Sequence, residues 1–81
     1  MKEIDLMQAR KELQRKLGND YTVTYYFCDN PYLEVSGSNI IDTFALKTVV
    51  WYCTIHCLHY YVTTNIGSKN PYIVIYKHTA P

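Results

Sequence analysis

The sequence predicts an α+β fold in which two helices pack on an antiparallel sheet, in the order αββαββ. Three observations predict it. Two segments have helical spacing or length, and four others are rich in β-branched and aromatic residues. A tripeptide, Asn-Pro-Tyr, begins at residue 30 and again at residue 70, an offset of 40. Because 81 residues leave no room for a second core, we expect one small α+β domain, residues 1–81.

The composition is that of a folded, nearly neutral chain. Apolar residues make up 48% and charged residues 19%, which argues against disorder. The 8 Lys and Arg residues against 7 Asp and Glu residues give a net charge of +1. This balance argues against a strongly basic nucleic-acid-binding protein and against an acidic mimic of DNA. The unusual feature is the content of tyrosine, with nine residues.

Residues 2–17 are predicted to form the first helix. Four apolar residues recur at steps of three and four and so share one face: Leu6, Ala9, Leu13 and Leu17. Gly18 follows directly and can adopt the left-handed conformation that closes a helix.

Residues 21–28 and 32–35 are predicted to form two strands joined by a turn at residues 29–31. The first strand alternates between an apolar and a more polar face, and its apolar face comprises Tyr21, Val23, Tyr25 and Phe27. Pro31 and the Asp and Asn before it favour the turn. In the second strand we expect Leu33 and Val35 to face inward.

Residues 42–58 are predicted to form the second helix, with Asp42 as its N-cap. The many β-branched residues favour a strand instead, but strands longer than about ten residues are unusual. A strand therefore stays open as the alternative. Residues 60–64 and 72–77 are then the last two strands, and which face of the sheet the helices cover is left open.

The repeated tripeptide indicates an internal pseudo-repeat of about 40 residues. Further identities at the same offset lie in the first helix and first strand: Leu6 with Leu46, Tyr21 with Tyr61, and Thr24 with Thr64. Two helix–strand–strand units would explain them. Chance combined with shared turn chemistry is the alternative.

The second helix carries more apolar surface than one sheet face can bury. One stripe comprises Leu46, Val49, Val50, Cys53 and Cys57, and the other comprises Phe44, Trp51, Ile55 and Leu58. Leaving four large side chains exposed would forgo about 1.5–3 kcal/mol each. We expect the second stripe to be a protein interface, with a second copy in a homodimer or with another protein, unless the first helix covers it.

The sequence offers weak patterns for a metal site and for a cysteine nucleophile. Cys53, His56, Cys57 and His59 resemble metal ligands, but structural zinc sites draw their ligands from two separate elements. A Cys–His nucleophile would need an orienting third group, which no spacing in the sequence supplies. We therefore predict no catalytic residues, no metal and no cofactor.

Tyrosines in strands suggest an alternative function, because single-stranded nucleic acid stacks its bases on aromatic side chains of a sheet. The candidate residues are Tyr26, Tyr32, Tyr61, Tyr72, Tyr76 and Lys77. The electrostatic groove that supplies most of the affinity is not evident in the sequence. We therefore treat nucleic acid as the less favoured partner.

The function predicted from these observations is binding rather than catalysis. An odd number of cysteines, three, is a poor disulfide framework and favours the cytoplasm, and the charged start is unlike a secretory signal. The uncharged stretch from 48 to 68 holds too many polar residues for a membrane span. We expect a homodimeric binding protein, such as an inhibitor of a host or partner protein encoded by a virus or mobile element.

Overall fold

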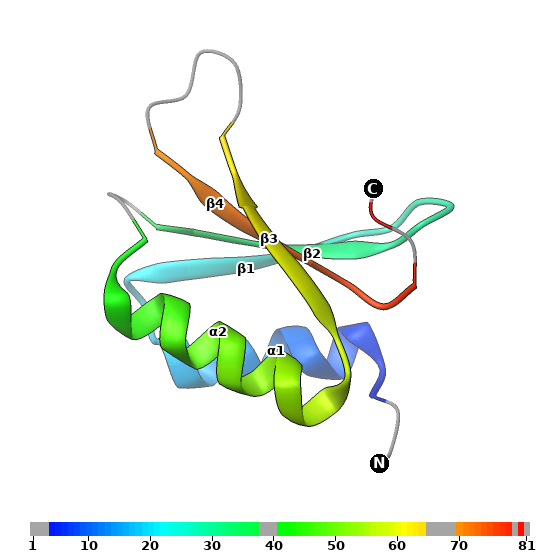
Figure 1. Ribbon diagram of the computed structural model, residues 1–81, viewed down its shortest axis with the longest axis horizontal. Coiled ribbons are helices and arrows are strands. Elements are labelled where there is room, and N and C mark those ends of the chain that lie inside the picture. The colour runs from blue at the N-terminus through cyan, green and yellow to red at the C-terminus, as the bar shows by residue number, and fades with distance from the viewer. Residues whose placement is uncertain (1–3, 38–40, 65–69, 79, 81) are drawn as a thin grey trace.

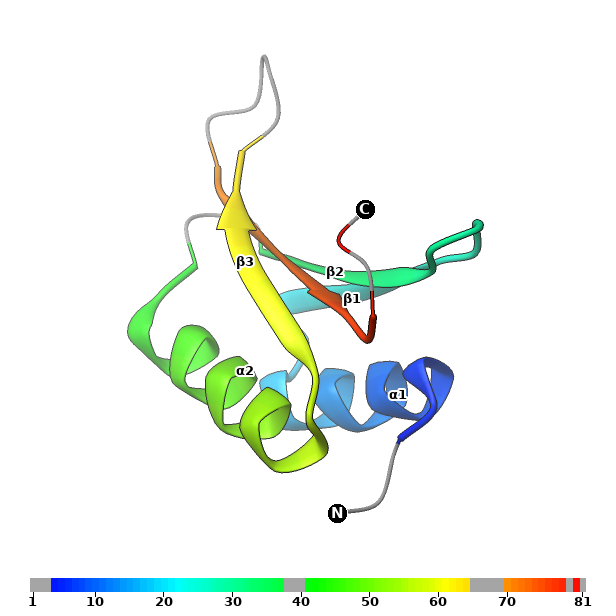
Figure 2. The same ribbon diagram turned by 45° about the vertical axis from the view of Figure 1, so that its right-hand side comes forward.

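The computed structural model describes residues 4–37, 41–64, 70–78 and 80, and it confirms the predicted order αββαββ. The elements are α1 (Leu6–Leu17), β1 (Tyr21–Tyr26), β2 (Tyr32–Gly37), α2 (Thr43–His56), β3 (His59–Thr63) and β4 (Tyr72–Tyr76). The strands form one antiparallel sheet in the order β1-β2-β4-β3. Both helices lie on the same side of this sheet (Figure 1, Figure 2).

Helix α1 begins at Leu6 rather than at residue 2. The side chain of Asp5 is the N-cap and accepts a hydrogen bond from the backbone N–H of Met7 at 2.9 Å. The helix ends as predicted at Gly18, whose φ of +84° lies in the region that favours glycine. The predicted apolar stripe is buried, and it comprises Leu6, Ala9, Leu13 and Leu17.

Strands β1 and β2 form the predicted hairpin with shifted ends. Strand β1 stops at Tyr26, so Phe27 leaves the sheet and is 87% exposed instead of facing inward. Strand β2 continues to Gly37, two residues beyond the prediction. Val23 pairs with Val35 across the hairpin, and both side chains are buried beneath the helices.

Helix α2 is a helix, as predicted, and not a long strand. Asp42 caps it by accepting a hydrogen bond from the backbone N–H of Ala45 at 2.9 Å. The helix ends at His56, two residues earlier than predicted, because Cys57 adopts a left-handed conformation with φ of 56° and ψ of 39°. The N–H of Cys57 donates to the carbonyl of Cys53 and closes the last turn.

The two central strands, β2 and β4, pair in a register that matches the 40-residue offset of the repeated tripeptide. Glu34 of β2 is the register partner of Val74 of β4, and these positions are 40 residues apart (34 + 40 = 74). The β2–β4 pairing is therefore centred on positions that the 40-residue offset makes equivalent. At the edge this equivalence is lost, since β3 pairs with β4 in a register displaced by three residues from that of β1 with β2.

The helices divide the sheet unequally. Helix α1 packs against β1 and β2, whereas α2 packs against α1 and β3. Tyr52 joins the two helices: its ring is 1% exposed, and its hydroxyl donates a hydrogen bond to the Glu12 carboxylate. Helix α2 divides its contacts between α1 and β3, and part of α2 and part of β3 stay uncovered.

Candidate interaction surfaces

Three large apolar side chains lie along one uncovered side of α2. Phe44, Trp51 and Ile55 are 55%, 53% and 39% exposed. Steps of seven and four residues keep them in one strip of a helix. We call these three residues the Trp51 stripe. Its members are exposed because the residues that α2 buries lie on another side of the helix: Ala45, Val49, Tyr52 and Cys53.

Leu58 is not part of this stripe, although its spacing from Phe44, Trp51 and Ile55 suggested it. The left-handed conformation of Cys57 ends α2 at His56, two residues before Leu58. The chain then turns toward β3, and Leu58 enters the core with 7% of its surface exposed. Its backbone N–H donates to the Cys53 carbonyl at 2.9 Å, which fixes the turn.

An open groove of about 390 Å³ lies against the Trp51 stripe. It is lined by Lys16, Phe44, Lys47, Thr48 and Trp51. The ammonium of Lys16, from the last turn of α1, lies 5.2 Å from the centroid of the Trp51 ring, within the range of a cation–π interaction. Of the described residues that line this Trp51 groove none is acidic, so it combines an apolar wall with two positive charges. The sequence carried no signal for Lys16, because only the packing of α1 beside α2 brings it there.

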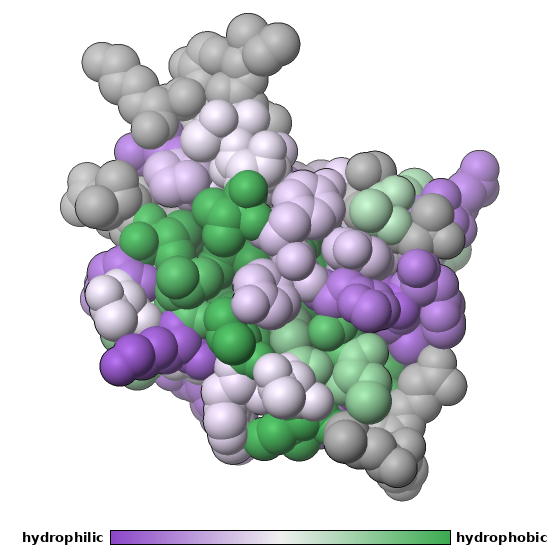
Figure 3. Space-filling model, viewed as in Figure 1, coloured by the Kyte–Doolittle hydropathy of each residue, from purple (hydrophilic) through white to green (hydrophobic). Residues whose placement is uncertain are grey.

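A second apolar surface lies where α2 meets β3. Leu46 is 39% exposed, Tyr60 is 40% exposed and Val62 is 49% exposed. We call these residues the β3 patch. Figure 3 shows hydrophobic side chains gathered over this part of α2 and β3. Leu46 was expected in the same stripe as Val49 and Cys53, but the residues that α2 buries are Ala45, Val49, Tyr52 and Cys53, and Leu46 lies outside this group.

Tyrosines gather on the face of the sheet opposite the helices. One row crosses all four strands, since Tyr26 pairs with Tyr32, Tyr32 with Tyr76, and Tyr76 with His59. The rings stack, with centroids 5.0 Å apart for Tyr26 and Tyr32 and 5.3 Å apart for His59 and Tyr76. Tyr61 lies on the same face, 6.0 Å from Tyr76. Strand alternation places Tyr72 there as well, two residues from Val74.

This tyrosine face carries one acidic group near its centre. Glu34 is the register partner of Val74 in the middle of the sheet. Burial raises the pKa of the Tyr32 and Tyr72 hydroxyls, and the charge of Glu34 raises both further, so these tyrosines are protonated at neutral pH. Lys77, expected on this face, lines a pocket beside the N-terminus of α1 instead.

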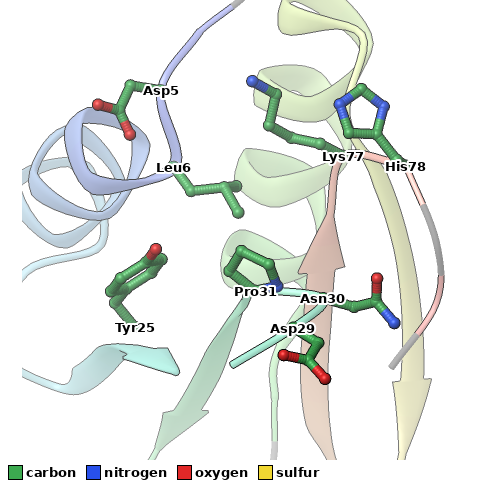
Figure 4. Close-up of a pocket in the computed structure, with 8 residues that line it drawn as sticks. All are labelled: Asp5, Leu6, Tyr25, Asp29, Asn30, Pro31, Lys77 and His78. Atoms are coloured by element: carbon green, nitrogen blue, oxygen red, sulfur yellow. The ribbon is translucent and has the colours of Figure 1, made fainter. Parts of the chain in front are cut away.

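That pocket, of about 310 Å³, lies between the start of α1, the β1–β2 turn and the end of β4 (Figure 4). Asp5 and Asp29 bring negative charge, and Lys77 brings positive charge. Asp5 already accepts the capping hydrogen bond of α1. The mixture of charges selects no single class of ligand.

The cysteine and histidine residues of the second half do not converge. Cys53 is buried, and burial raises the pKa of its thiol to about 12, which keeps it protonated and unreactive. Cys57 is exposed beyond the helix end, and His56 packs on Tyr52 with ring centroids 4.3 Å apart. His59 lies on the tyrosine face. Among the described residues, no three His, Cys, Asp or Glu side chains are placed to hold a metal ion.

No protein-family model matches the chain, and neither a curated protein nor a solved structure matches it. Within the described ranges, no helix has the length and apolar character needed to cross a membrane. The two uncovered apolar surfaces and the tyrosine face are therefore interpreted from their own chemistry.

Proposed function

We propose that the protein is a small non-enzymatic binding module that inhibits a partner protein by covering part of its surface. The observation that carries this proposal is the exposure of the Trp51 stripe beside a positively charged groove. Trp is among the residues that most often anchor protein interfaces, and Phe is enriched in them as well.

The exposed stripe is energetically significant for so small a domain. Full burial of a large apolar side chain contributes about 1.5–3 kcal/mol, so burying the exposed half of each stripe residue in a partner contributes about 1 kcal/mol apiece. Helix α1 supplies little cover, since within the groove its contribution to the lining is Lys16. A partner surface is therefore the natural place for these side chains.

The charges of the groove define the chemistry of the partner. Lys16 and Lys47 flank Trp51, and none of the described lining residues is acidic. The matching ligand is an amphipathic segment of another protein with apolar anchors and carboxylates beside them. Such pairing of opposite charges steers association and fixes the register of the complex.

A comparison of two variants tests this proposal. Affinity purification with the wild type should capture a partner that Trp51→Ala loses and Phe27→Ala keeps. Phe27 is a matched control because it is a large apolar residue, 87% exposed, in the β1–β2 turn and outside the groove. The captured protein is then purified and titrated against each variant, and equal affinity for wild type and Trp51→Ala contradicts the proposal.

A second candidate function is the binding of single-stranded nucleic acid, which the alignment of Tyr26, Tyr32 and Tyr76 in one row favours. The charge of Glu34 near the centre of this face opposes a phosphate backbone. Fluorescence anisotropy with a labelled single-stranded oligonucleotide at low salt is the test. Binding that weakens with salt and with Tyr76→Ala supports this candidate, and no binding at low salt removes it.

We also propose that the protein acts in the cytoplasm. The three cysteines, Cys28, Cys53 and Cys57, lie in the described part of the chain and form no disulfide, and Cys28 and Cys57 are exposed. Exposed thiols fit a reducing compartment. Cell fractionation with an antibody tests the location, and recovery from an oxidising compartment contradicts it.

A further inference from the structure

We infer that two copies of this chain pair through the edge of β3, about a two-fold axis at which Tyr61 lies opposite Tyr61 of the second copy. This inference is independent of the proposed function. Lys16 of α1 borders the Trp51 groove, whereas the β3 patch lies on the side of α2 that meets β3. The dimer thus leaves the groove open.

The sheet has two edges, and the edge formed by β1 is already occupied over its first half. The side-chain amide of Gln14 donates to the carbonyl of Tyr21 at 2.8 Å and accepts from the N–H of Val23 at 2.9 Å. These are the hydrogen bonds that a neighbouring strand would make. Gln14 therefore blocks the first half of β1 from pairing with another chain.

The same contacts show which backbone groups reach the β3 edge. In an antiparallel strand, the N–H and C=O of one residue point to one side, and successive residues alternate. The backbone groups of Tyr21 and Val23 that bond to Gln14 point away from β2. Because the registers are continuous from β1 to β3, the direction of the backbone groups can be followed residue by residue across the sheet. There the odd-numbered residues bond to β4, and the backbone groups of Tyr60 and Val62 point outward.

Strand β3 is complementary to itself in one register. With Tyr61 on the two-fold axis, Tyr60 lies opposite Val62 of the second copy, and Val62 lies opposite Tyr60 of the second copy. Both pairs have outward backbone groups, so the register allows four backbone hydrogen bonds. On the helix side, each pair joins an aromatic ring to a β-branched side chain, which is a favourable cross-strand combination.

Strand β3 lacks the charged residues and the proline that commonly protect an edge strand from association. Its sequence, His-Tyr-Tyr-Val-Thr, contains no Lys, Arg, Asp, Glu or Pro. Tyr60 and Val62 are already 40% and 49% exposed, and Leu46 of α2, the helix that packs against β3, is 39% exposed. In the dimer the side of each α2 that carries Leu46 faces the two-fold axis and packs over the paired β3 strands. The two-fold contact uses the β3 edge of both copies, and Gln14 blocks the first half of β1, so the assembly closes at two copies.

Site-directed disulfide formation tests the register. In a Cys28→Ser, Cys57→Ser background, Tyr61→Cys places two thiols opposite each other at a pair without backbone hydrogen bonds, close enough to bond. We expect a covalent dimer under mild oxidation. Thr22→Cys is the matched control, since Thr22 is exposed on the same sheet face of the other edge strand. Failure of Tyr61→Cys to cross-link, or equal cross-linking of both variants, overturns the inference.

Sedimentation velocity on Val62→Pro provides a second test. The N–H of Val62 points to the free edge, so proline removes no bond to β4 and the monomer still folds. It removes two of the four intermolecular hydrogen bonds, and we expect the dimer dissociation constant to rise about tenfold or more. Circular dichroism verifies that the variant is folded. A wild type that is monomeric at millimolar concentration overturns the inference, as does a dimer lost with Trp51→Ala and kept with Val62→Pro.

Discussion

Replacing Trp51 by alanine should leave the fold nearly intact, whereas the same change at the neighbouring Tyr52 should destabilise it severely. Trp51 is 53% exposed, and Lys16 is the cation that its ring contacts. Its partial burial is worth about 1 kcal/mol and an exposed cation–π pair about 0.5–1 kcal/mol, so Trp51→Ala should cost about 1–2 kcal/mol. Tyr52 is 1% exposed, and truncating a buried aromatic residue costs about 3–5 kcal/mol.

Chemical denaturation followed by far-UV circular dichroism measures both costs. This probe is needed because Trp51 is the single tryptophan of the chain, so its fluorescence is lost in the variant. For a domain of this size, a difference of about 2 kcal/mol between the variants also separates their melting temperatures by about 8–16 °C. Equal destabilisation by the two variants would show that Trp51 belongs to the core and not to a binding stripe.

Three further predictions follow from the contacts of the core and of the β1 edge: one on acid stability, one on cysteine reactivity and one on Gln14. The hydrogen bond from Tyr52 lowers the pKa of Glu12 below its ordinary value of 4.5, so this carboxylate stabilises the fold above pH 4.5 and the contribution is lost as the pH falls through the lowered pKa. Denaturation curves from pH 7 to pH 3 should therefore show a smaller acid-induced loss for Tyr52→Phe than for the wild type, and identical losses contradict this. A thiol reagent should react quickly with the exposed Cys28 and Cys57 and slowly with Cys53, because burial raises the pKa of the Cys53 thiol to about 12. Equal reaction rates at all three cysteines contradict this. Gln14→Met removes the side-chain hydrogen bonds to β1 and should lower the free energy of unfolding by about 1–3 kcal/mol, measured by chemical denaturation. An unchanged stability would show that these bonds are not formed in solution.

The fold was predictable because its local signals agree with one another. The stripe of α1, the cap at Asp42 and the turn at Pro31 each mark an element that the structure contains. Gly18 ends α1 as predicted, because glycine is the usual residue at that conformation. The sequence predicted that α2 would end two residues later than it does. Cys57 ends the helix in a left-handed conformation that few non-glycine residues adopt, so its residue type gave no sign of the end.

The surfaces were only partly predictable, because exposure depends on how the elements pack. Strand alternation was enough to suggest that Tyr26, Tyr32 and Tyr76 share a face. The sideways position of α2 is a tertiary property, and it exposes Leu46, which the helical pattern placed in the core. The register of β3 is tertiary as well, so the exposure of Val62 on the helix side had no signal in the sequence.

Quenching of Trp51 fluorescence by acrylamide tests the central claim most directly, because no other tryptophan contributes. In the free protein, the half-exposed ring should be readily quenched. When the purified partner binds, the emission should shift to shorter wavelengths and the quenching constant should fall several-fold. A ring that is protected in the free protein, or one that is quenched equally in the complex, would contradict the account.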